Sequence, residues 1–302
     1  MNISLPNMNA TEMTVTANFS HDCRNTSDYS KCIITTVMLI ICFIGIPLNG
    51  IVIWLLGFQI KRNPFTVLIL NLAIADFGLL LCMSIYYIDT VTGFISSKIP
   101  WYIFFSLLHI MYLSGMFLLT AISIDRCVAV LFPIWHRCSR PKSLSSAICA
   151  FLWIFSFLLI GMLNITQHVF KYRHFSLDLV VTVVLCVPLI TISTVIVFTK
   201  MGFKSKQMKR RRLLLMILIT LLCFLILTLP LDIFVFITHF FRLTYWLQHG
   251  EFDTCFNLCS SLNCSVNPVI YFLVGRKKRL QSRENVKVIF QRIFKEEEAP
   301  ET

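Results

Sequence analysis

Two charged residues, Asp125 and Arg126, lie next to each other where a long apolar run of the sequence ends. The segment that follows them, up to Pro141, is basic and interrupted by prolines. An acid and an arginine at the rim of a membrane helix are costly unless each is paired or solvated, so such residues usually serve a function. Asp125 and Arg126 are therefore either an interfacial ion pair that only ends the helix or part of a functional site.

Polar side chains also lie inside three other apolar runs. Asn49, Asp76 and Asn267 fall at similar depths in a membrane if successive helices alternate in direction. A buried amide usually forms a hydrogen bond between helices, and a carboxyl group in the middle of a membrane needs partners or water. One inward polar network is therefore the least costly arrangement. Pro268 frees a backbone carbonyl and gives the helix that carries Asn267 and Tyr271 a place to bend.

The composition is that of a membrane protein. Of the 302 residues, 57% are hydrophobic and 14% are charged, whereas about a quarter of the residues of a soluble domain are charged. Seven apolar runs, each near or above the ~20 residues that cross the hydrocarbon, occupy 32–58, 65–93, 100–131, 143–166, 175–201, 213–241 and 247–274. We predict an all-α membrane protein with a seven-transmembrane-helix bundle over residues 32–274.

The charges predict how the bundle is oriented. Of the 27 Lys and Arg residues, 21 fall on the side of the spans that carries Arg126, and the positive-inside rule places that side in the cytoplasm. The polar tail of residues 1–31 is then extracellular, and it carries four glycosylation sequons, at Asn2, Asn9, Asn18 and Asn25. Because the positive charge is confined to one side of the spans, we expect no nucleic acid as a partner.

The cytoplasmic tail of residues 275–302 has its own periodic pattern. Apolar side chains recur on one helical face among many basic residues, at Val286, Ile289, Phe290, Ile293 and Phe294. This pattern predicts a short amphipathic helix that lies on an anionic lipid leaflet.

Residues 120–141, TAISIDRCVAVLFPIWHRCSRP, resemble the end of the third helix and the second cytoplasmic loop of rhodopsin-like G-protein-coupled receptors. The Cys after the Asp-Arg pair and the string PIWHRCSRP are similar to the Mas-related family in particular, as is LLGFQIKRNPFTVLILNLAIADF at residues 55–77. Asn267 to Tyr271 resembles the NPxxY element of the same receptors. The resemblance covers nearly all of the membrane core.

This resemblance implies a multi-pass plasma-membrane receptor without a cofactor. Such a receptor binds an extracellular ligand and activates a heterotrimeric G protein, here of the Gq or Gi class. It implies that Asp125 and Arg126 are the G-protein contact, and that Asn49, Asp76, Asn267 and Tyr271 form the transmembrane polar network.

The sequence departs from the rhodopsin-like pattern in two places near the outer half. Thr228 stands where these receptors usually carry a tryptophan in helix 6. The usual disulfide between helix 3 and the second extracellular loop has no cysteine at either end. Four other cysteines leave a disulfide between the tail and helix 7 open in the oxidising extracellular space: Cys23, Cys32, Cys255 and Cys259.

A third departure concerns the resting state. In many rhodopsin-like receptors an acid at the cytoplasmic end of helix 6 holds the helix 3 arginine. Residues 205–215 contain no acid, so we expect one fewer restraint between helices and a larger active population without ligand.

The candidate ligand site lies in the outer half of the spans. Asp232 follows Pro230 by two residues and should face the bundle, because an uncompensated acid in mid-helix is expensive. With its neighbours it would form an acidic, aromatic vestibule that favours cationic peptides or small amines. The residues assigned to this vestibule are Asp232, Asp178, Tyr112, His109, Phe236, Tyr245 and Trp246.

A small seven-helix transporter or ion-conducting protein is the alternative to a receptor. Transporters and pumps use acid relays or inverted repeats, and neither is visible in the sequence. The predicted helix 7 contains no lysine for a retinal Schiff base. No metal-ligand spacing, nucleophile elbow or phosphate loop occurs, so we predict that the protein is not an enzyme and holds no metal.

Overall fold

The computed structural model describes residues 26–93, 100–141, 143–170, 180–203, 208–240 and 251–275, and their regular structure is entirely helical. The order of elements is α2 (Thr26–Trp54), η2 (Leu55–Gln59), α3 (Pro64–Thr92), α4 (Trp101–Leu131), α5 (Pro133–Cys138), α6 (Leu144–Phe170), η3 (Thr182–Cys186), α8 (Val187–Phe203), α9 (Met208–Leu227), α10 (Leu229–Phe240) and α12 (Glu251–Gly275).

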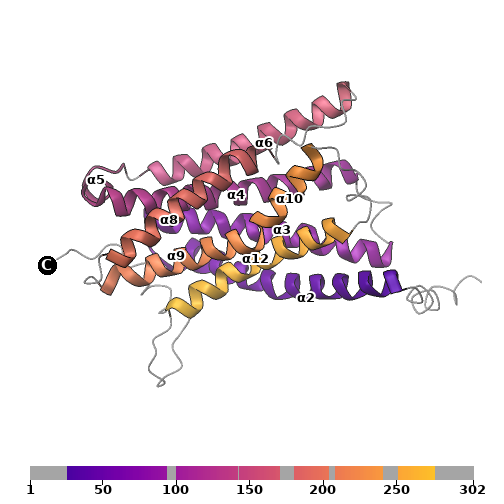
Figure 1. Cartoon of the computed structure of the whole chain (residues 1–302), viewed down its shortest axis with the longest axis horizontal. Coiled ribbons are helices and arrows are strands. Elements are labelled where there is room, and N and C mark those ends of the chain that lie inside the picture. The colour runs from indigo at the N-terminus through magenta and orange to yellow at the C-terminus, as the bar shows by residue number, and fades with distance from the viewer. Residues whose placement is uncertain are drawn as a thin grey trace, which may run out of the picture.

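The long helices lie side by side in one bundle, with the short α5 at one end (Figure 1). Six segments are long and apolar enough to cross a membrane: Cys32–Gln59, Pro64–Thr92, Trp101–Leu131, Leu144–Thr166, Thr182–Lys200 and Leu214–Thr238. The helix α12 packs against α2, α3 and α9 in the same bundle. The six spans and α12 together correspond, among the described residues, to the seven apolar runs of the sequence.

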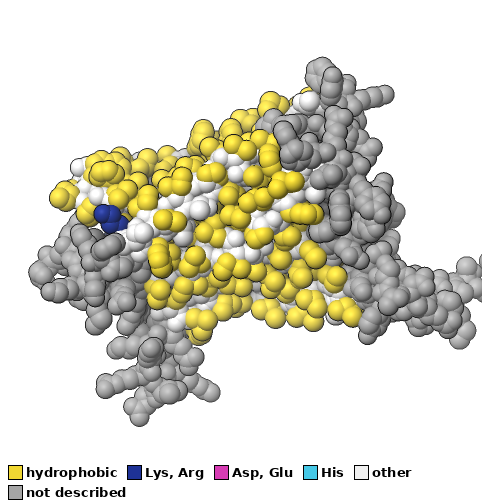
Figure 2. Space-filling view, in the orientation of Figure 1, with side chains coloured by type: hydrophobic (Ala, Val, Ile, Leu, Met, Phe, Trp, Pro, Cys, Tyr) yellow, Lys and Arg dark blue, Asp and Glu magenta, His cyan; other side chains and the backbone are white. Residues whose placement is uncertain are grey.

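The lateral surface of the bundle suits lipid rather than water. Figure 2 shows hydrophobic side chains along most of the described length of the bundle on the face that is in view. Large apolar side chains such as Phe43, Phe151 and Phe198 are more than half exposed. Contiguous apolar surface of this extent marks a contact with membrane or with protein.

The ends of α3 are set by local sequence. Asn63 caps its first turn: the Asn63 side chain accepts a hydrogen bond from the Thr66 N–H at 2.7 Å, and the Thr66 hydroxyl accepts one from the Asn63 N–H at 2.8 Å. Pro64 takes the first helical position, where no N–H is needed. Gly93 ends the helix in the left-handed region, at φ 62°. These ends fix the position of Asp76 along the helix.

The sixth apolar span is interrupted where the sequence carries a proline, and the structure divides it into α9 and α10. The helix α9 ends at Leu227 and α10 starts at Leu229, directly before Pro230, which has no N–H to donate. The N–H of Asp232 bonds to the Thr228 carbonyl at 3.0 Å. The π-helical turn η3 leads directly into α8, and such turns often lie at functional sites.

Side-chain hydrogen bonds tie α6 to the inner helices. The Trp153 indole N–H donates to Asn71 Oδ1 on α3 at 3.1 Å. The Asn164 amide donates to the Ser106 hydroxyl on α4 at 2.7 Å. These bonds fix α6 against the two helices that carry the central charged and polar residues.

Several predictions fall outside the described residues. They are the sequons at Asn2, Asn9, Asn18 and Asn25, the amphipathic tail helix, and the starts of the fifth and seventh predicted spans. The sequence allowed a disulfide between the tail and helix 7. The cysteines that the structure describes do not form it, since Cys32, Cys255 and Cys259 are free thiols. Cys23 also lies outside the described residues.

Candidate functional site

Asp125 and Arg126 form an ion pair near the α5 end of α4. Asp125 Oδ2 accepts hydrogen bonds from Arg126 Nε at 3.0 Å and from Nη2 at 2.5 Å. Arg126 is only 2% exposed, so its charge is almost fully removed from solvent. A buried ion pair is tolerated only when its remaining polar atoms are also paired.

The second oxygen of Asp125 is held by the segment that follows α4. Arg140 Nη2 lies 2.7 Å from Asp125 Oδ1, and His136 Nε2 lies 3.4 Å from the same atom. Arg140 also contacts His136 Nε2 at 2.8 Å and donates to the Ser145 hydroxyl on α6 at 2.6 Å. Asp125 therefore connects α4 to α5 and to the start of α6.

An aromatic ring covers the face of the Arg126 guanidinium. The Arg126 Cζ atom lies 3.9 Å from the centroid of the Phe65 ring. Phe65 belongs to the first turn of α3 and is fully buried. Sequence reasoning missed Phe65, because nothing in a single sequence shows which side chain of one helix meets the arginine of another.

Arg140 and His136 were also missed as partners of Asp125, and Ser145 was missed as a partner of Arg140. The sequence carried a usable signal for two of them, since several basic residues follow a single acid within one short segment. Which of these residues reach the carboxylate depends on the path of the chain through α5.

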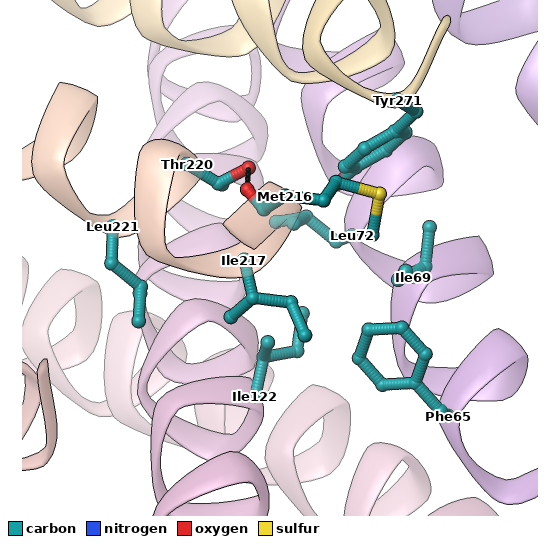
Figure 3. A pocket seen from close by; sticks show the side chains of 9 residues that line it. All are labelled: Phe65, Ile69, Leu72, Ile122, Met216, Ile217, Thr220, Leu221 and Tyr271. Atoms are coloured by element: carbon teal, nitrogen blue, oxygen red, sulfur yellow. Dashed lines mark hydrogen bonds between the residues drawn. The ribbon is translucent and has the colours of Figure 1, made fainter. Parts of the chain in front are cut away.

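A narrow cavity lies beside this cluster, between α3, α4, α9 and α12. Its walls are mostly apolar and come from Phe65, Ile69, Leu72, Ile122, Met216, Ile217, Thr220, Leu221 and Tyr271 (Figure 3). The side chains of α9 and the Phe65 ring stand on opposite sides of this space. Packing between α9 and α3 is therefore incomplete at this depth.

The predicted polar network is brought together in part. Asn267 Nδ2 donates to Asp76 Oδ2 at 2.8 Å, which joins α12 to α3. Asn49 Nδ2 donates to the carbonyls of Gly45 and Cys264, each at 3.1 Å, which joins α2 to α12. Tyr271 is buried and lies at the cavity.

The candidate ligand residue Asp232 is paired with Tyr112. The Tyr112 hydroxyl donates to Asp232 Oδ1 at 2.8 Å, and this bond joins α4 to α10. Asp232 is 0% exposed, and its Oδ2 atom has no hydrogen-bond partner within the described part of the chain. Tyr112 precedes Arg126 by 14 residues, or about 21 Å along α4.

The other predicted vestibule residues are placed differently. His109 is exposed on α4, and its Nδ1 atom lies 2.7 Å from the Phe105 carbonyl. Phe236 is half-buried on α10, one turn after Asp232. Asp178, Tyr245 and Trp246 lie outside the described residues. Where residues are described, no group of three or more His, Cys, Asp and Glu side chains is arranged to hold a metal ion.

Comparison with known proteins identifies the family. The profile of the 7 transmembrane receptor (rhodopsin family) matches residues 48–271. Mas-related G-protein coupled receptor member H of Mus musculus is 37% identical over 270 residues, which cover 86% of this chain and 83% of that protein. Proto-oncogene Mas of Homo sapiens is 34% identical over 280 residues, covering 89% and 85%.

Mas-related G-protein coupled receptor member D of Homo sapiens is 35% identical over 280 residues, covering 88% of this chain and 86% of that protein. The matches extend over most of the chain on both sides, so they concern the whole membrane core and not a single motif. The matches favour the receptor over the transporter. They also agree with the prediction that the protein is not an enzyme, because the matched family consists of signalling receptors. The chain belongs to the rhodopsin-like G-protein-coupled receptors, within the Mas-related family.

Proposed function

We propose that this receptor is activated by a cationic extracellular ligand, a basic peptide or a small amine, and that it couples to a G protein of the Gq or Gi class. Its N-terminal tail lies outside the cell and is glycosylated, and the α5 end faces the cytoplasm. The 21 Lys and Arg residues on that side of the spans support this orientation.

The observation that carries the ligand proposal is the buried carboxylate of Asp232. A buried oxygen without a hydrogen bond costs free energy, and Asp232 Oδ2 is such an oxygen among the described residues. A ligand cation that reaches this atom would recover that cost through a charge-assisted bond. Because Asp232 is 0% exposed, binding requires side chains on the outer side to move.

The α5 end has the features of a contact site for a protein. Arg126 lies near the α5 end of α4, and apolar side chains protrude from the segment that follows, with Phe132 60% and Ile134 80% exposed. Apolar residues next to an arginine are typical of binding hot spots. We assign Asp125 and Arg126 to the contact with the G-protein α-subunit.

Nucleotide exchange on purified Gq and Gi, with the full-length receptor in lipid nanodiscs, tests the ligand proposal. The ligands are basic peptides and small amines, each paired with an uncharged analogue of the same shape. We expect the cationic member of a pair to activate. The variant Asp232→Asn should weaken binding of the cationic ligand by about 1–3 kcal/mol, which is the scale of a charge-assisted hydrogen bond.

The matched control is Asp89→Asn, which removes a different buried acid from the outer half of α3. A loss of potency in Asp232→Asn alone supports the assignment. Equal potency of charged and uncharged ligands, or equal losses in both variants, would contradict it.

A further inference from the structure

The guanidinium of Arg126 is fixed on two sides by different kinds of contact. Its edge donates from Nε and Nη2 to Asp125, and its face lies on the Phe65 ring with 3.9 Å between Cζ and the ring centroid. Arginine combines these contacts well, because the planar group presents donors at its edge and a cationic face to a ring.

The Phe65 ring is itself held in place. It follows directly after the cap of α3, in which Asn63 and Thr66 exchange hydrogen bonds of 2.7 and 2.8 Å. Phe65 is fully buried and Arg126 is 2% exposed, so little water competes for the contact. A cation on a ring is worth more when it is desolvated in this way.

Neither contact involves α9. The cavity separates the Phe65 ring from the α9 side chains Met216 and Ile217 (Figure 3). The contact between ring and guanidinium therefore does not depend on close packing of α9 against α3. This contact joins α3 to α4, whereas the acid that holds the arginine in many rhodopsin-like receptors would join α4 to the sixth span, here α9.

We propose that Phe65 is a positioning residue that holds Arg126 in the resting receptor through this cation–π contact. For Arg126 to reach a G protein, its guanidinium must leave the face of the ring. Weakening the ring's attraction for the cation then raises the fraction of receptor in which Arg126 is free. The proposal rests on the assignment of Arg126 as the G-protein contact.

The experiment replaces Phe65 with phenylalanines that carry one, three and five ring fluorines in the full-length receptor. Fluorine withdraws charge from the ring face and keeps its shape, so it weakens the attraction step by step. Ligand-free nucleotide exchange is measured at equal receptor density. We expect exchange to rise with each step, by about two- to thirtyfold at five fluorines, the range given by a contact of this strength.

Phe117 provides the matched control. It is a buried phenylalanine on α4 whose ring lies tilted against that of Phe155, with 5.5 Å between ring centroids. The same fluorine series at Phe117 should leave ligand-free exchange unchanged, because it changes the charge of a buried ring that does not lie on Arg126. Phe65→Tyr, which keeps the ring, should stay near the wild type, whereas Phe65→Leu should resemble the five-fluorine variant.

A fluorine resonance measurement tests the contact without a G protein. The signal of singly fluorinated Phe65 should move when Arg126 is replaced by Ala, and the signal of singly fluorinated Phe117 should not. A flat exchange series at Phe65, an equal rise in the Phe117 series, or a resonance that does not respond to Arg126→Ala overturns the proposal.

The assignment of Arg126 to the G-protein contact and the role of Phe65 can be disproved separately. If Arg126→Ala still activates the G protein with agonist, the assignment of Arg126 is wrong. If Arg126→Ala is silent and fluorination of Phe65 has no effect, only the role of Phe65 is wrong.

Discussion

Asn267 on α12 donates a hydrogen bond to Asp76 on α3, with 2.8 Å between Asn267 Nδ2 and Asp76 Oδ2. Both residues are buried, Asn267 at 1% and Asp76 at 4% exposure. The bond crosses between two helices that are far apart in the sequence, and it lies next to Pro268, where α12 can bend.

Removal of the acceptor should destabilise the receptor. Asp76→Leu leaves the Asn267 amide buried without this partner, at a cost of about 1–3 kcal/mol. Asp76→Asn keeps an acceptor oxygen and should cost less. Thermal unfolding of the purified receptor measures both. Equal melting temperatures for Asp76→Leu and the wild type would show that the bond adds nothing to stability.

The sequence predicted this pair for a physical reason. An amide and an acid inside apolar runs are expensive alone, so their meeting could be expected from their depths. Asp125 is different: its bonds to Arg140 and His136 depend on how the chain folds through α5, which no local pattern determines. The contact of Phe65 with Arg126 is harder still to predict, because nothing in the sequence indicates that an ordinary apolar ring will face a cation.

In the vestibule, too, the sequence predicted which residues take part but not how they contact each other. Tyr112 and Asp232 were both assigned to it, because each lies in the outer half of an apolar run. Their hydrogen bond to each other could not be predicted, since it depends on the rotation of α4 and α10 about their axes. That rotation is set by packing along the whole length of the bundle.

Gly45 on α2 should not tolerate a methyl group. A Cβ atom there would lie 2.2 Å from Ser265 Oγ and 2.7 Å from Leu80 Cδ1. We expect Gly45→Ala to cost about 1–3 kcal/mol through overpacking. The control is Gly161→Ala on α6, where a Cβ would meet nothing within 4 Å; there alanine should be neutral or stabilising, because it favours the helix.

A double-mutant cycle identifies the cause of the loss at Gly45. Ser265→Ala removes the nearer atom, so Gly45→Ala should cost less in that background than in the wild type. Thermal unfolding is again the measurement. If the cost is the same in both backgrounds, the clash with Ser265 is not its source.

Trp101 should link the ends of α3 and α4 that lie away from α5, where the usual disulfide of rhodopsin-like receptors has no cysteines. Its ring lies 6.3 Å from the ring of Tyr86 on α3 and 5.2 Å from that of Phe104, both edge-on. Aromatic pairs of this geometry add about 0.5–1.5 kcal/mol each beyond burial. We expect Trp101→Ala to lower the melting temperature and Trp101→Phe to recover part of it. An unchanged melting temperature in Trp101→Ala would remove this cluster from the stabilising contacts.

The most direct test of the account is agonist-driven nucleotide exchange by Arg126→Ala at matched surface expression, compared with Lys61→Ala, which removes an exposed cation from the same side of the bundle. Arg126 carries the proposed contact with the G-protein α-subunit, so the Arg126 variant should bind the cationic agonist and fail to stimulate exchange, while the Lys61 variant signals as the wild type does. Normal exchange by Arg126→Ala would contradict the account.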